Sequence, residues 1–240
     1  MADDFPELCV QTFTGPWWEE STNLNLRKGR LVYAFVPHVD SNPRTLEIQG
    51  RPEDQHDHSR ATFKLKALRA QDARQQSKLP VALLPEYEGE VYGIYRTKRR
   101  PVVVLHDPRE EPPKAVRQGG ANWQGIQNAL VVPAYGVEKT DKRVGWPKPF
   151  VDRIQRAEYP GYMWDRFPDG LPGGSILRLD QIVPMGTGSA AFKPTKWCLT
   201  DIAHRLMLDW LEWYLSGEPT PASVELAAIR GLLLQDEGSI

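Results

Sequence analysis

Cysteine is scarce in this chain of 240 residues, and neither sign of charge dominates. Cys9 and Cys198 are its two cysteines and lie far apart, which argues against a disulfide framework or a cysteine zinc cluster and indicates reduced thiols. The 30 Lys and Arg residues nearly balance 31 Asp and Glu residues, for a net charge of −1. Any binding of nucleic acid would therefore need a local basic patch.

Long apolar runs and the common catalytic motifs are also absent. No run of about 18 apolar residues occurs, so we expect no membrane-spanning helix and no membrane partner. The opening segment, MADDFPELCVQTF, has neither a basic region nor an apolar run, so we expect no secretory signal and a cytoplasmic protein. Without a GxSxG, GxxxxGK[ST], GxGxxG or HExxH motif, hydrolases and transferases built on those devices are disfavoured.

Turn-forming and aromatic residues are plentiful, with 19 Gly, 21 Pro, eight Trp and eight Tyr. Branched and aromatic runs between turns favour short strands, and helical periodicity follows them. Thr200 suits the N-cap of the first helix, and Gly217 ends it. The pattern predicts one elaborated α+β domain over residues 1–240, with a small, strongly bent sheet or barrel. Its predicted strands cover about 27–37, 61–68, 90–105, 128–136 and 174–184, and its helices about 200–216 and 221–234.

A dense basic run precedes the apolar stretch 102–105. It holds Arg96, Lys98, Arg99 and Arg100, four cations in five residues. A guanidinium binds two phosphate oxygens at once, so we interpret this run as a possible anion site on a turn. The alternative is a solvated loop whose charges keep an apolar strand soluble.

Tyr135 ends a predicted buried strand, where its side chain has two interpretations. It donates a hydrogen bond to a phosphate or stacks on a base, or it merely caps the rim of the core. Trp210 and Trp213 lie on the apolar face of the last long helix, which predicts core positions. His204 lies on neither apolar row of that helix, so we expect it at the surface.

The remaining histidines give no metal site. His56 and His58 resemble a metal clip, but no closely spaced carboxylate or cysteine completes it, so we expect no metal and no other cofactor. An unperturbed histidine titrates near neutral pH. His56, His58 and His106 therefore remain open as the acid or base of a reaction, and nothing in the sequence selects one.

Three stretches, in order, resemble the MazF/PemK family of toxin endoribonucleases. Arg99–Leu105 (RRPVVVL) is similar to that family's Arg-Pro-apolar strand, and 128–134 (NALVVPA) to the next core strand. Residues 174–183 (GSILRLDQIV), followed by a leucine-rich helix, resemble its last strand and helix, and 29–35 would be the opening strand. The match covers about half of the chain, and Leu-Asp-Gln-Ile is its most specific piece.

The resemblance implies an SH3-like β-barrel that forms a homodimer and cuts single-stranded RNA without a metal. The ribose 2′-OH would attack the adjacent phosphate and leave a 2′,3′-cyclic phosphate. Arg100 matches the family's arginine, which would stabilise charge on the five-coordinate phosphate. Tyr135 takes the place of a family threonine, and Tyr95 that of an acidic residue. The added loops would be 39–78, 107–127 and 138–173.

Two functions therefore stay open. In the first, the protein is an mRNA-interferase-like toxin in which Arg100 and Tyr135 are catalytic, while Arg96, Lys98 and Arg99 bind the RNA backbone. In the second, it is a catalytically inactive module of a toxin–antitoxin or phage-defence assembly. That module would hold an antitoxin or regulatory protein where the family holds RNA.

Overall fold

A computed structural model gives the fold of two compact units, residues 1–36 with 99–240 and residues 37–98. The described residues are 8–38, 42–50, 56, 60–70, 90–106, 113, 115, 119, 128–141, 144–168, 174–188, 190–219 and 224–235. The second unit contains a two-stranded antiparallel sheet, β3 (Arg44–Gly50) with β4 (Thr62–Ala67). The prediction that 61–68 is a strand is confirmed, but its assignment to the main sheet was wrong, because β4 pairs with β3. The polar stretch 38–60, most of which was expected to be an added loop, supplies the strand β3.

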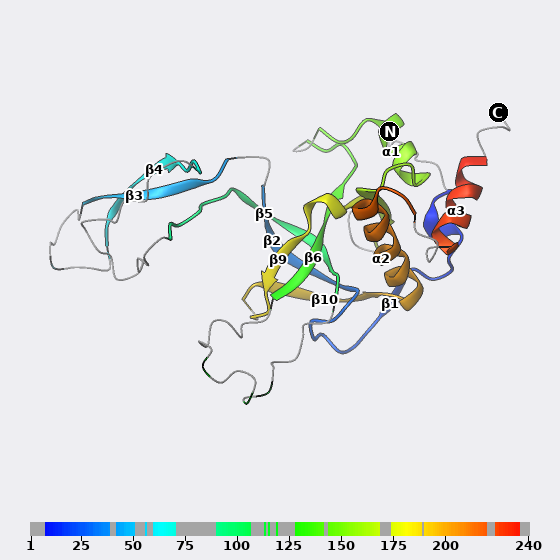
Figure 1. The fold of residues 1–240 in the computed structure, drawn as a ribbon, viewed down its shortest axis with the longest axis horizontal. Coiled ribbons are helices and arrows are strands. Elements are labelled where there is room, and N and C mark those ends of the chain that lie inside the picture. The colour runs from blue at the N-terminus through cyan, green and yellow to red at the C-terminus, as the bar shows by residue number, and fades with distance from the viewer. Residues whose placement is uncertain are drawn as a thin grey trace. The chain divides into compact units, whose positions relative to one another are not determined.

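The first unit is built on one antiparallel sheet with the order β1-β10-β2-β5-β6-β8-β7, and β9 also pairs with β6 (Figure 1). Predicted strands are confirmed where branched apolar residues run continuously. The strands are β1 (Trp18–Glu20), β2 (Arg30–Pro37), β5 (Thr97–Val104), β6 (Asn128–Gly136), β7 (Tyr162–Arg166), β8 (Gly174–Arg178), β9 (Val183–Gly186) and β10 (Phe192–Leu199).

Strand β6 changes partner along its length. Its first residues pair with β9 and its last with β8, while β5 occupies its other edge. The 3₁₀ turn η3 (Leu179–Gln181) joins β8 to β9. The chain bends there and returns to the same neighbour, which gives the strongly bent sheet that we expected. The described strands do not close into a barrel, so the α+β class is confirmed and the SH3-like barrel is not.

Helix α2 covers one face of this sheet, and α3 packs against α2 and η1 (Val10–Thr12), as Figure 1 shows. Helix α2 (Asp201–Ser216) begins as predicted at Thr200, whose hydroxyl accepts from the Ala203 N–H, and ends at Gly217, which has φ +84°. Helix α3 spans Val224–Gln235. Trp210 and Trp213 are buried, which confirms the predicted core positions. Among the described helices, none is both long and apolar enough to cross a membrane.

The opposite face of the sheet carries two smaller cores. One contains the alternate valines of β2, β5 and β6, among them Val102 and Val104, with Val183 and Met185 of β9 packed against it. The other lies under α1 (Lys148–Gln155), where Val151 and Ile154 pack on Ile176 and Trp164 among several aromatic rings. Strands β1, β3, β7 and β10 and helix α1 were not predicted. The added loop 107–127 and the predicted start of the second C-terminal helix at 221–223 lie wholly or largely outside the described residues.

A fully buried carboxylate ties the N-terminal segment to β7. Asp165 accepts hydrogen bonds from the indole N–H groups of Trp17 and Trp18, each 3.0 Å long. Gln11 donates a third bond of 3.4 Å. The three donors are neutral, so burial raises the pKa of Asp165 to about 7 although these hydrogen bonds act to lower it.

Gly174 begins β8 where a large ring leaves no room for a side chain. A Cβ at this position would lie 2.6 Å from Cζ2 of Trp164, and that indole is buried. We expect Gly174→Ala to lower the free energy of unfolding by about 1–3 kcal/mol, because an overpacked core must shift. Gly186→Ala is the matched control, since a Cβ there meets nothing within 4 Å. Denaturant unfolding measures both, and equal losses would contradict the packing argument.

Candidate functional site

Arg100 and Tyr135 lie together on the first unit. Val102 pairs with Pro133 and Val103 with Val132, and the same register places Arg100 opposite Tyr135. The Arg100 guanidinium carbon lies 4.0 Å from the centre of the Tyr135 ring, and both side chains are partly buried. The structure thus brings together the two residues that the sequence proposed as catalytic.

A second arginine, Arg178 at the end of β8, faces the same tyrosine. Its guanidinium carbon is 5.6 Å from the ring centre of Tyr135 and 4.7 Å from that of Tyr162 on β7. Its Nε and Nη2 donate to Asp180 at 2.6 and 2.5 Å. Burial acts to lower the pKa of Arg178, but Asp180 outweighs it and raises that pKa, so the guanidinium stays charged.

The hydroxyl of Tyr135 is committed to a neighbour in η3. It donates a hydrogen bond to Oε1 of Gln181, which belongs to the Leu-Asp-Gln-Ile element. The hydroxyl of Tyr135 is therefore bonded to Gln181, and its ring is contacted by two arginines. We call Arg100, Tyr135, Tyr162, Arg178, Asp180 and Gln181 the arginine–tyrosine site.

Arg99, one of the other predicted cations, does not join this site. Lys98, Arg99 and Arg100 belong to β5 and not to a turn, which corrects the sequence interpretation. Successive strand residues point to opposite faces, so Arg99 lies away from Arg100 and stacks on Tyr33, with its guanidinium carbon 4.6 Å from that ring centre. Arg96 and Lys98 are exposed residues of the second unit.

The sequence left three histidines open as the acid or base of a reaction at Arg100. His106 follows the far end of β5, and the four residues from Arg100 to Val104 already span about 13 Å. His56 is an exposed residue of the second unit, and His58 lies outside the described residues. His204 was wrongly expected at the surface. It is buried with 7% exposure, and its Nε2 donates to the Leu105 carbonyl oxygen at 2.8 Å.

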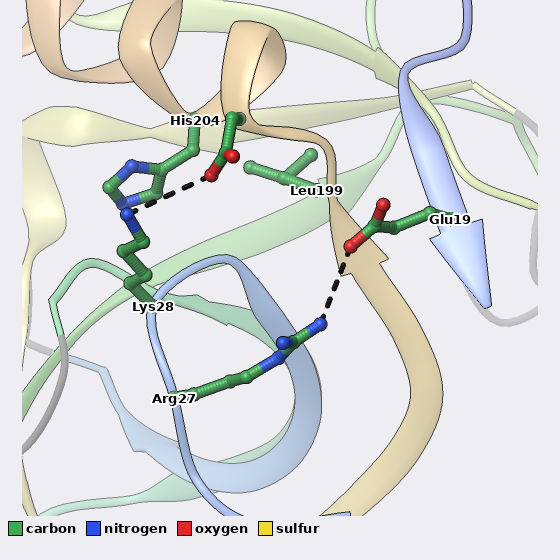
Figure 2. Close-up of a pocket in the computed structure, with 6 residues that line it drawn as sticks. Glu19, Arg27, Lys28, Leu199 and His204 are labelled. Atoms are coloured by element: carbon green, nitrogen blue, oxygen red, sulfur yellow. Dashed lines mark hydrogen bonds and ion pairs between the residues drawn. The ribbon is translucent and has the colours of Figure 1, made fainter. Parts of the chain in front are cut away.

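A separate pocket of about 210 Å³ opens near the start of α2 (Figure 2). Its charged rim residues form two pairs, Glu19 with Arg27 at 3.4 Å and Lys28 with Asp201 at 3.7 Å. The volume is below the roughly 300 Å³ at which small-molecule sites begin. The pocket shares no residue with the arginine–tyrosine site, and we assign no function to it. Its lining consists of Glu19, Arg27, Lys28, Leu199, Asp201 and His204.

Comparison with known proteins adds no relative. No protein-family model, no curated protein and no solved structure matches this chain. Within the described part of the chain, no group of three or more His, Cys, Asp or Glu residues lies close enough to hold a metal ion. The chemistry of the site therefore has to be argued from its own cations and rings.

Proposed function

We propose that this protein binds single-stranded RNA at the arginine–tyrosine site and cleaves it without a metal, as an mRNA-interferase-like toxin does. The observation that carries the proposal is the Arg100 guanidinium stacked on Tyr135 at 4.0 Å, beside a second arginine. Guanidinium groups bind phosphates, and aromatic rings stack on unpaired bases. A mixed set of both is typical of surfaces that hold single-stranded nucleic acid.

The proposed reaction uses the substrate's own nucleophile. The ribose 2′-OH attacks the adjacent phosphorus, and the bond from phosphorus to the 5′-oxygen of the next nucleotide breaks. The products are a 2′,3′-cyclic phosphate and a 5′-hydroxyl, and the proton of the 2′-OH passes through solvent to the leaving oxygen. Arg100 stabilises the charge that develops on the five-coordinate phosphate. Tyr135 orients Arg100 and the scissile phosphate.

The finer assignment to a MazF/PemK-like protein also belongs to this proposal. It includes an SH3-like barrel, a homodimer, a cytoplasmic location and an antitoxin that covers the site. After β8 the chain bends at η3 and continues as β9, and both strands pair with β6. A bend of this kind supports the proposed barrel. The position of Leu179-Asp180-Gln181 in that bend, next to Tyr135, supports the resemblance in this element.

The direct test incubates the purified protein with mixed-sequence single-stranded RNA in excess EDTA. We expect cut RNA with 2′,3′-cyclic phosphate ends, identified by mass spectrometry. DNA of the same sequence is the matched control and should stay intact, because it lacks the 2′-OH. Intact RNA with folded protein would reject the nuclease.

A second candidate is a catalytically inactive module that holds RNA or a protein at the same site. The hydroxyl of Tyr135 is engaged by Gln181, and His106 follows the end of β5 that is far from Arg100. Both observations favour binding without cleavage. In the same assay, RNA that is retained by the protein and remains uncut would select this candidate.

A further inference from the structure

The guanidinium of Arg178 is held in a fixed orientation, and only some of its hydrogen-bond donors have partners in the described part of the chain. Its side chain is 15% exposed and lies between the rings of Tyr135 and Tyr162. Asp180 takes the edge formed by Nε and Nη2. The remaining nitrogen, Nη1, has no hydrogen-bond partner among the described residues, and it is not one of the buried atoms that lack a partner. It is therefore a fixed donor that faces solvent.

The placement of Arg178 relative to Arg100 suits a chain of phosphates. The guanidinium carbon of Arg100 lies 4.0 Å from the centre of the Tyr135 ring, and that of Arg178 lies 5.6 Å from it. Their separation is therefore at most the sum of these distances, and consecutive phosphates of one nucleic-acid strand fit within that span. Both guanidinium groups contact the ring of Tyr135, which holds the two cations near one another.

We propose that Arg178 binds the phosphate next to the scissile one through Nη1, so that the site holds two consecutive phosphates of a single strand. This inference rests on the proposed function. It makes Arg178, which the sequence did not single out, the second cation of the site in place of Arg99, which stacks on Tyr33. Asp180 keeps the guanidinium of Arg178 oriented, and its negative charge offsets part of the positive charge of that group. The contact of Arg178 with a phosphate is therefore weaker than the contact of Arg100.

The test measures how RNA affinity depends on salt. Each phosphate contact with a single strand contributes about 0.7 to the slope of log affinity against log salt concentration. The probe is a fluorescent oligoribonucleotide with 2′-O-methyl groups, which cannot be cut, titrated by anisotropy in a series of KCl concentrations. We expect Arg178→Gln to reduce the magnitude of the slope by about 0.7. Arg178→Lys should restore it, because the charge is kept.

Arg153→Gln is the matched control, since Arg153 also stacks on a tyrosine, at 5.0 Å from the ring centre of Tyr159, and is not itself a residue of the site. Its slope should equal that of the unsubstituted protein. An unchanged slope in Arg178→Gln, even with weaker binding, would show that Arg178 only positions Tyr135 and would overturn this inference alone. Absence of any binding by the unsubstituted protein would instead overturn the proposed function.

Discussion

Arg100→Ala is expected to reduce RNA cleavage by about 100- to 1,000-fold. This is the cost of removing one preorganised group that stabilises a developing negative charge. The Arg100 side chain stacks on the face of Tyr135 beside an apolar strand run, and it is not one of the buried core residues. Single-turnover cleavage of a fluorescent RNA measures the effect, and circular dichroism confirms that the variant is folded.

Arg99→Ala is the matched control because Arg99 is the next residue of the same strand. It carries the same charge but stacks on Tyr33, on the opposite face of β5. We expect this variant to lose at most a few-fold in rate. Equal losses in the two variants would show that the charge density of the basic run matters and that the geometry at Tyr135 does not.

The buried carboxyl of Asp165 is expected to make stability depend on pH in an unusual direction. Its pKa is raised from 3.8 to about 7, so between these values the folded protein holds a proton that the unfolded chain has released. Its contribution is therefore fully present near pH 4 and is lost as pH rises through 7. The slope is about 1.4 kcal/mol per pH unit, and the total is on the order of 4 kcal/mol.

Asp165→Asn tests this dependence, because the amide cannot ionise in this range. The free energy of unfolding by urea, measured from pH 4 to 8, should fall less steeply in the variant than in the unsubstituted protein. Asp141→Asn changes an exposed aspartate and serves as control for the other carboxyl groups. Parallel curves for Asp165→Asn and the unsubstituted protein would refute the raised pKa.

The sequence predicted those helices and strands whose own residues carry a hydrophobic pattern. The valines of β5 and β6 and the apolar periodicity of α2 were sufficient for those elements, because burial on both faces or on one stripe dictates their composition. Strand β7 reads Tyr-Met-Trp-Asp-Arg and buries an aspartate, which a polarity pattern assigns to a loop. The buried aspartate of β7, Asp165, accepts hydrogen bonds from Trp17 and Trp18. These partners are distant in the sequence, so the residues around Asp165 give no sign of them.

The site likewise contains residues that the local sequence predicted and one that it did not. Arg100 and Tyr135 were found because each ends or begins an apolar strand run. Arg178 was missed because its role depends on the pairing of β7 with β8, which places it opposite Tyr162. Burial of His204 was missed for a related reason, since its partner is the carbonyl of Leu105 on a distant strand. Composition had favoured a turn for the basic run, but strand β5 begins at Thr97 and includes Lys98, Arg99 and Arg100.

The pairing of β1 with β10 sets an order of events during synthesis. Trp18 lies opposite Leu199, so the edge strand has no partner until some 180 further residues have been made. At about 5–20 residues per second, this takes on the order of ten seconds or more on the ribosome. Strands β3 and β4 lie close together in the sequence, so both have been synthesised long before β10 is made. We therefore expect the first strand to be made to be among the last to join its sheet, and the nascent chain to leave both indoles of Trp17 and Trp18 open to chaperones meanwhile.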